Sequence, residues 1–282
     1  MVDQYPFVKG HGTENDFVLL PDADGSLHGV LNAERVVALC DRRAGIGGDG
    51  VIRVIRSSAL AAYDRAAIGQ DAEWFMDYRN SDGSVSEMCG NGVRVFARFL
   101  ADEHLADPSA PVTVATRGGT KTVTFEGDLI TVDMGRPEVL GESKVAVGDQ
   151  HTWVARHVDM GNPHAVAFVD DLADAGRLFD EPAYDRATYP HGVNIEFVVR
   201  RGERHLAMRV HERGSGETRS CGTGACAAMV AAAVADGARP GREPVSYRVD
   251  VPGGALTVTW TADDRVLLTG PAVLVAWGTA RL

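Results

Sequence analysis

The feature that most constrains this chain is an internal repeat centred on two cysteines. Cys89–Gly92 and Cys221–Gly224 both have the pattern Cys-Gly-x-Gly, and they lie at an offset of 132 residues. The same offset aligns Met76 with Met208, and it aligns the apolar stretches that follow the two motifs. Each half therefore has the order strand, polar loop, Cys-Gly-x-Gly and apolar helix. This shared order over about 30 residues indicates a duplicated domain.

Length and composition agree with two ordinary globular domains. The chain has 282 residues, about two domains at roughly 150 residues each. Four cysteines are too few for a disulfide-built scaffold, and a net charge of −11 argues against a general nucleic-acid or membrane-surface binder. The longest apolar run, Ala225–Ala235, is too short to span a bilayer, and Met1–Pro6 lacks the pattern of a secretory signal. We therefore expect a cytoplasmic protein with reduced thiols.

Short β-type runs bounded by glycine, proline or acidic residues dominate the chain. These runs predict strands over residues 17–20, 50–55, 73–78, 112–115, 120–125, 129–134, 153–158, 165–169, 194–199, 205–210, 247–251, 255–260 and 266–270. Helices are predicted over 34–41, after an Asn32 N-cap, and over 93–105, 172–179 and 224–235. The last helix is apolar on nearly all sides, so we expect protein to surround it.

The two repeated cysteines stand just before the first turn of a predicted helix. Unpaired N–H groups and the positive end of the helix dipole lower a thiol pKa there and favour the thiolate. The neighbouring glycines let backbone N–H groups approach a bound carboxylate. If the two halves face each other, one thiolate removes a proton from a substrate carbon while the opposite thiol returns one to the other face.

Two simpler interpretations of these cysteines compete with that one. Cys89 and Cys221 have the size and polarity of small buried hydrophobes, which most cysteines are. A metal site is disfavoured, because Cys221 and Cys226 have no nearby set of Cys or His partners in the sequence.

Further motifs carry a resemblance to a known family. In chain order they are Lys9–Phe17, Gly45–Gly50, Asn80–Ser84 leading to Cys89–Gly92, Gly161–His164, Gly192–Asn194 and Glu212–Gly224. With these motifs the sequence resembles the bacterial diaminopimelate epimerases, which act without pyridoxal phosphate. Cys-Gly-x-Gly occurs in the wider racemase superfamily, whereas Glu-Arg-Gly-x-Gly-Glu-Thr ahead of the second cysteine is typical of this family in particular.

The resemblance implies a role for each matched residue. Cys89 and Cys221 correspond to two catalytic thiols. The substrate-binding positions it implies are Asn15, Asn80, Gly90, Asn91, Asn162, Asn194, Glu212, Arg213, Gly222 and Thr223. Among them, Arg213 suits the distal carboxylate of a diamino dicarboxylate, and Glu212 suits an ammonium group. His164 is placed near the site without a role, and neither a metal nor a cofactor is implied.

The resemblance also implies a fold and an activity. The fold is α/β (α+β), with two pseudo-symmetric domains that each wrap a curved mixed β-sheet or barrel around a central apolar helix. Residues 1–130 plus the C-terminal strand 270–282 form the domain of Cys89, and residues 131–269 form the domain of Cys221. The implied activity is the cofactor-independent epimerisation of LL-2,6-diaminopimelate to meso-diaminopimelate in lysine and peptidoglycan-precursor synthesis. The implied enzyme is a cytoplasmic homodimer that binds neither nucleic acid nor membrane.

Departures from the family pattern keep alternatives open. Gly50 stands where many members have Gln, Glu14 where glycine is frequent, and His211 where Tyr is common. One alternative is a racemase for proline, hydroxyproline or histidine. Another is a binding protein, or a non-redox isomerase, of the same fold in which the cysteines are inert. The asparagines also lie in turns, where asparagine is common for conformational reasons.

Overall fold

The computed structural model describes residues 4–62, 64–148 and 151–281, which form two compact units. The first unit comprises Met1–Val132 with Pro271–Leu282, and the second comprises Asp133–Gly270. Residues 1–3, on which the expectation of no secretory signal partly rests, lie outside the described residues. Residue 282, the last of the predicted C-terminal strand, lies outside them as well.

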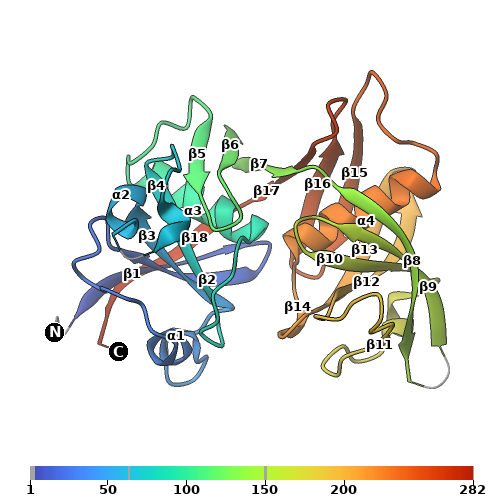
Figure 1. Cartoon of the computed structure of the whole chain (residues 1–282), viewed down its shortest axis with the longest axis horizontal. Coiled ribbons are helices and arrows are strands. Elements are labelled where there is room, and N and C mark those ends of the chain that lie inside the picture. Colours follow the sequence, from blue (N-terminus) through green and yellow to red (C-terminus); the bar gives the residue numbers. More distant parts are fainter. Residues whose placement is uncertain (1–3, 63, 149–150, 282) are drawn as a thin grey trace. The chain divides into compact units, whose positions relative to one another are not determined.

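The first unit is a mixed sheet with the strand order β18–β1–β2–β3–β4–β5–β6–β7 (Figure 1). Its strands are β1 (Tyr5–Gly12), β2 (Asn15–Pro21), β3 (Gly50–Arg56), β4 (Trp74–Asn80), β5 (Val112–Ala115), β6 (Lys121–Glu126), β7 (Leu129–Gly135) and β18 (Val273–Ala280). The β2–β3 and β4–β5 neighbours are parallel, and the other neighbours are antiparallel.

One apolar helix fills the inside of this sheet. Helix α3 (Gly90–Asp102) packs against β1 to β5 and against β18, and it buries Phe96 and Leu100 completely. The shorter elements are α1 (Ala33–Cys40), α2 (Ser57–Leu60) and the 3-10 turn η1 (Arg65–Ala67). The predicted cap of α1 is confirmed, because the Asn32 side chain accepts a hydrogen bond from the backbone N–H of Arg35 at 2.9 Å.

The second unit repeats this topology with the strand order β8–β9–β10–β12–β13–β15–β16–β17. Its strands are β8 (Glu138–Val147), β9 (His151–Asp159), β10 (Pro163–Phe168), β11 (Ala183–Tyr184), β12 (Asn194–Gly202), β13 (His205–Glu212), β14 (Gly216–Thr218), β15 (Val245–Val251), β16 (Gly254–Trp260) and β17 (Val266–Pro271). Again two neighbouring pairs are parallel, here β10–β12 and β13–β15. Short strands β11 and β14 pair with β8 and β13 respectively.

Helix α4 (Gly222–Ala235) is the counterpart of α3 (Figure 1). It begins 132 residues after α3, which is the offset of the sequence repeat. It packs against β9, β10, β12, β13, β15 and β16, and almost all of its residues are buried. The predicted α/β fold is therefore confirmed: two pseudo-symmetric halves each wrap a mixed sheet around one apolar helix.

Two helix predictions need correction. The helix predicted over 93–105 starts earlier and runs over Gly90–Asp102, because Cys89 itself is the N-cap. The prediction over 172–179 is wrong in extent: only a 3-10 turn, η2 (Leu172–Ala175), forms there, and Gly176 ends it with a φ of 58°. The predicted strands are all observed, with bounds that differ by a few residues.

The sequence did not reveal strands β1 and β8, or the two short strands β11 and β14. Strand β1 contains Pro6 and two glycines, which are depleted in strands. Strand β8 is mostly exposed, so its side chains give no sustained apolar alternation.

The strand that leads toward the first cysteine is anchored by a buried charge cluster. The Asp77 carboxylate on β4 is fully buried and accepts hydrogen bonds from Arg53 at 2.6 Å and Arg117 at 2.8 Å. Burial alone raises the pKa of Asp77, but the charges of Arg117, Arg53 and Arg79 outweigh it and hold that pKa below the usual value.

The substitution Asp77→Asn should lower the free energy of unfolding at pH 7 by about 3 kcal/mol, because it leaves buried guanidinium groups without their counter-charge. Since the folded pKa of Asp77 is depressed, its contribution is complete above the unfolded value of about 3.9. The contribution is lost as pH falls through the lower folded value, so the difference between variant and wild type should shrink in acid.

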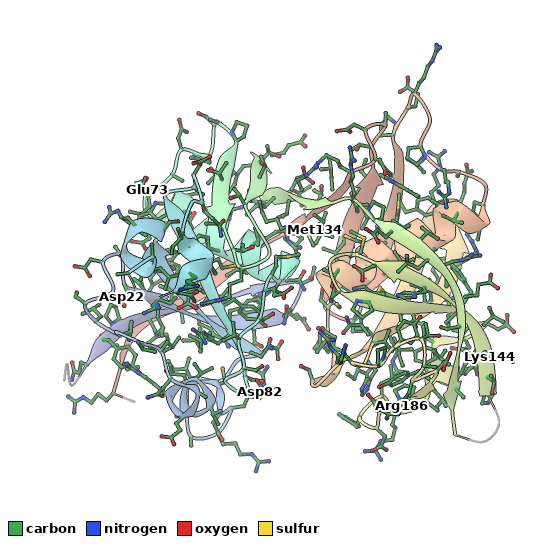
Figure 2. The ribbon with its side chains drawn as sticks, in the orientation of Figure 1. Asp22, Glu73, Asp82, Met134, Lys144 and Arg186 are labelled. Atoms are coloured by element: carbon green, nitrogen blue, oxygen red, sulfur yellow. The ribbon has the colours of Figure 1, made fainter. Side chains whose placement is uncertain are left out.

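Urea unfolding at pH 7 and in acid measures this difference. The matched control is Glu73→Gln, because Glu73 lies at the periphery of the first unit in an exposed pair with Arg56 (Figure 2). This control should change the free energy by less than about 0.5 kcal/mol. Superimposable curves for D77N and wild type at pH 7 would show that the cluster does not stabilise the unit.

Candidate active site

In the first unit the site is built at the N-terminus of α3, where Cys89 is the N-cap in an extended backbone conformation. Its Sγ atom accepts a hydrogen bond from the Gly92 N–H at 3.5 Å and lies 3.6 Å from Oδ1 of Asn15. The N–H groups of Gly90 and Asn91 belong to the first helical turn, at the positive end of the helix dipole. The turn therefore offers both a sulfur and N–H donors suited to an anion.

A chain of amides and charges orients the polar groups around Cys89. Asn15 accepts a hydrogen bond from the side chain of Asn91 at 3.2 Å and donates one to Asp49 at 2.7 Å. Asp49 in turn accepts from Arg42 at 2.7 Å. Burial, reinforced by the carboxylate of Asp16, raises the pKa of Asp49 despite the hydrogen bond from Asn15. The structure thus brings three predicted site residues together, Asn15, Cys89 and Asn91.

Asn80 is held separately, as the last residue of β4. It lies opposite Gly50 in the β3–β4 ladder, and its side chain donates to the hydroxyl of Ser84 at 2.9 Å. A side chain at position 50 has no room, because a Cβ atom there would lie 2.5 Å from the Arg79 carbonyl and 2.6 Å from the Tyr78 ring. The Tyr78 ring therefore occupies the space that a side chain at position 50 would need, and only glycine fits there.

The departure at Glu14 has a backbone explanation. Thr13 and Glu14 have φ angles of 49° and 60°, in the left-handed region that favours glycine. The strained pair directly precedes Asn15, the start of β2. Glycine at position 14 would adopt this turn without strain, which accounts for its frequency in the family pattern.

In the second unit Cys221 is the N-cap of α4. Its Sγ accepts a hydrogen bond from the Gly224 N–H at 3.3 Å and lies 3.5 Å from the hydroxyl of Thr223. Burial, followed by the charges of Glu212 and Glu196, raises the pKa of the Cys221 thiol well above its usual value. The expectation that the helix N-terminus lowers this pKa is therefore wrong for Cys221, because desolvation of the thiolate outweighs the N–H groups.

A buried hydrogen-bonded chain leads away from Cys221. Asn162 donates from its amide to the Thr223 hydroxyl at 3.4 Å, and its carbonyl oxygen lies 3.1 Å from Nε2 of His164. The other ring nitrogen of His164 lies 2.6 Å from the carboxylate of Glu196, and both side chains are fully buried. The structure thus connects Asn162 and Thr223 with His164, which the sequence left without a role.

The remaining predicted residues surround the start of β12 and the end of β13. Asn194 accepts from the Arg213 backbone N–H at 3.0 Å and donates to the Pro163 carbonyl at 3.3 Å. The guanidinium group of Arg213 donates to the His191 carbonyl at 3.2 Å. Glu212 accepts from the Thr218 hydroxyl. These contacts fix the loops that carry the polar groups.

Two residues that organise the site were missed in the sequence, Asp49 and Glu196. Asp49 lies within the Gly45–Gly50 motif, and its place in that motif was the sequence signal that could have identified it. Glu196 stands between Ile195 and Phe197 in an apolar strand, and a lone acidic residue in such a run is unusual. The histidine at position 211, where the family pattern commonly has Tyr, makes a hydrogen bond to the backbone: its Nδ1 lies 2.9 Å from the Leu178 carbonyl oxygen.

Within residues 4–62, 64–148 and 151–281, no group of three or more His, Cys, Asp or Glu residues is arranged to hold a metal ion. In the same described part of the chain, no helix has the length and apolar character needed to cross a membrane.

Solved structures share this fold along the whole chain. A phenazine biosynthesis protein of the PhzF family from Bacillus anthracis has a TM-score of 0.71 at 16% identity and covers 99% of both chains. A hydroxyproline epimerase from Agrobacterium vitis, with bound trans-4-hydroxy-L-proline, has a TM-score of 0.64 at 13% identity, covering 100% of this chain and 93% of the other. The fold therefore places the protein in the structural class that includes the PhzF-like proteins and this epimerase.

Sequence comparison narrows the class. Residues 7–140 and 156–275 match the family described as Diaminopimelate epimerase. The diaminopimelate epimerase of Streptomyces coelicolor is 56% identical over 285 residues, covering 99% of this chain and 96% of that protein. That of Thermobifida fusca is 48% identical over 279 residues, covering 98% of both. The chain belongs to the diaminopimelate epimerase family and is an isomerase, as the sequence motifs predicted.

Thiol alkylation in the absence of ligand should distinguish the cysteines. Cys89 is partly exposed and should react first with iodoacetamide. Cys221 is only 6% exposed and has a raised thiol pKa, so it should react at least about tenfold more slowly, since each pKa unit changes the thiolate fraction tenfold. Burial raises the pKa of Cys40 to about 12, so Cys40 should react only after unfolding. Peptide mass spectrometry follows each site, and equal rates at Cys89 and Cys221 would contradict the difference.

Proposed function

We propose that this protein interconverts LL-2,6-diaminopimelate and meso-diaminopimelate without a cofactor, in lysine and peptidoglycan-precursor synthesis. The observation that carries the proposal is the family match over nearly the whole chain. It is supported by a cysteine N-cap on each of two topologically equivalent helices. The two units defined by the fold are then the two epimerase domains, one for each cysteine.

Cys89 and Cys221 act as a two-base pair in this proposal. In one direction the Cys89 thiolate takes the α-proton, and the Cys221 thiol donates its proton to the opposite face of the carbon. The raised pKa of the Cys221 thiol supports its role as the donor, because the group is protonated before substrate arrives. After the reaction the protonation states of the two sulfurs are exchanged, and the reverse reaction starts from that state.

The helix termini hold the carboxylate at the reacting carbon. The first-turn N–H groups of Gly90, Asn91, Gly222 and Thr223 supply donors that remain in place while negative charge develops on the substrate. The proposed partners for the rest of the substrate are Asn15, Asn80, Asn162, Asn194, Glu212 and Arg213. The hydrogen bonds already made by these side chains support the proposal, since preoriented polar groups need little rearrangement on binding.

Replacing Cys89 by alanine should reduce kcat about 10³-fold, because a positioned acid–base group contributes roughly 10²–10⁴-fold. The control Cys40→Ala removes a thiol from α1 and should keep activity within about twofold of wild type, since it removes no acid–base group. Chiral chromatography of the diaminopimelate isomers measures both rates. Normal turnover by C89A would show that the two-base mechanism is wrong and would favour inert cysteines.

The same reaction in D2O tests the mechanism independently of mutation. Each thiol exchanges with solvent, whereas the proton taken from the substrate resides on the opposite sulfur. Deuterium should therefore enter the α-carbon of the product well before it enters recovered substrate. A panel of proline, hydroxyproline and histidine isomers tests the alternative substrates, and turnover of any of them faster than diaminopimelate would contradict the assignment.

We also propose that the enzyme is a cytoplasmic homodimer that binds neither nucleic acid nor membrane. Strand β18 presents Val273, Val275 and Trp277 at alternating positions, with exposed fractions of 44%, 53% and 57%. Three large apolar side chains on one strand face support association with a second copy of the chain.

Trp277→Glu should convert the dimer into a monomer, because it places a charge in the apolar contact. Light scattering after size-exclusion chromatography measures the mass. Leu140→Glu is the matched control, because Leu140 is 55% exposed on β8 of the second unit. A W277E protein that keeps the dimer mass would exclude this strand face as the contact.

A further inference from the structure

A buried ion pair lies beside the N-terminus of helix α4. It joins His164 of β10 to Glu196 of β12. Nδ1 of His164 lies 2.6 Å from Oε1 of Glu196, and both side chains have an exposed fraction of 0%. The second carboxylate oxygen of Glu196 is buried and has no hydrogen-bond partner among the residues the structure describes. A half-satisfied carboxylate in an apolar interior is unfavourable, so its presence needs a reason other than stability.

The side chain of Glu196 points toward α4. Its neighbours Ile195 and Phe197 lie in the core cluster on the opposite face of β12. A Cβ atom at Gly224 would lie 2.7 Å from Oε1 of Glu196 and 3.2 Å from Sγ of Cys221. Glycine at this position therefore lets the carboxylate and the sulfur approach the same point of the helix.

The hydrogen bonds determine where the protons lie. Because Asn162 uses its amide N–H to donate to Thr223, its carbonyl oxygen is the atom that faces Nε2 of His164. Nε2 then carries a hydrogen that it donates to Asn162. When Glu196 is ionised, Nδ1 donates to its carboxylate as well, and His164 holds both ring protons. The chain of donors then runs from His164 through Asn162 to the Thr223 hydroxyl, 3.5 Å from Cys221.

We propose that Glu196 is a positioning residue for the epimerisation: it holds His164 as the imidazolium ion and so fixes the Asn162–Thr223 chain that orients the Cys221 thiol. This inference rests on the proposed function, and it assigns to Glu196 a role that acts only through His164. The carboxylate itself contacts neither the substrate nor the reacting carbon.

The surrounding charges agree with a compensated pair. The ionisable groups that interact with it are His157 on β9, Tyr189 in the loop before β12 and Cys221. Glu212 on β13 acts on the same Cys221 thiol. Burial lowers the pKa of His157 despite the opposing charge of Asp159, and repulsion from His164 adds a smaller lowering. The Glu196 charge raises the pKa of Cys221, so loss of the His164 charge would leave that thiol facing an uncompensated carboxylate.

The first test is kinetic. Glu196→Gln preserves shape but lets His164 lose a proton, and it should lower kcat about 10- to 100-fold, as is usual for orienting partners of functional histidines. KM should change by less than kcat. Its pH–rate profile should gain a new ionisation between about pH 5 and 8, the range of an unpaired histidine. Glu196→Asp keeps the charge and should recover part of the loss. The control Glu142→Gln alters an exposed pair with Arg156 and should match wild type.

A double-substitution cycle separates positioning from general stability. If Glu196 acts through His164, E196Q should have little further effect in a His164→Gln background. Additive losses in E196Q/H164Q would overturn the proposal, as would an E196Q enzyme with the rate and pH profile of E142Q.

The last measurement does not depend on the substrate. Imidazole ¹⁵N spectra of the full-length protein, with the His164 signals assigned by their absence in H164Q, should show two protonated nitrogens at pH 7 in wild type. One nitrogen should lose its proton in E196Q. A bare ring nitrogen in wild type would overturn the proposal even if diaminopimelate is the substrate. If the wild type does not epimerise diaminopimelate but shows the imidazolium, the proposed function fails while the ion pair stands.

Discussion

The cysteine of each unit depends on the same local contact, in which its sulfur atom accepts the third N–H of a helix. Cys89 and Cys221 each stand one residue outside a helix and receive this bond, from Gly92 and Gly224 respectively. The bond fixes the sulfur beside the first-turn N–H groups, which point in the same direction. Glycine at position 224 suits the second unit, because a Cβ atom there would lie 2.7 Å from the carboxylate of Glu196 and 3.2 Å from the Cys221 sulfur.

The two halves share a scaffold but surround their cysteines differently. Near Cys89 the polar chain runs through Asn15 to Asp49 and ends in partly exposed charges. Near Cys221 it runs inward and ends at the fully buried Glu196. Burial therefore governs the second thiol more than the helix dipole does. A symmetric topology thus carries two sulfurs in unequal electrostatic surroundings.

Much of the fold was predictable because the repeat, the strand periodicity and the glycine-bounded turns are local patterns. What remained hidden depends on contacts between distant segments. The start of α3 at Gly90 needed the cap at Cys89, and the isolation of η2 needed the positive φ of Gly176. The role of Asp49 follows from a hydrogen bond across 34 positions of sequence, and no pattern within one strand reports such a bond.

The alanine-rich composition of α4 has a consequence for how accurately Cys221 is placed. Alanine loses no rotamer freedom on burial, whereas the valines, phenylalanines and leucine that α3 buries do. Helix α4 is therefore ordered at a smaller cost in side-chain entropy than α3, and strands surround it on several sides. Its alanines have no alternative rotamers, so changes within the helix itself disturb the position of its N-terminus less than they would in α3.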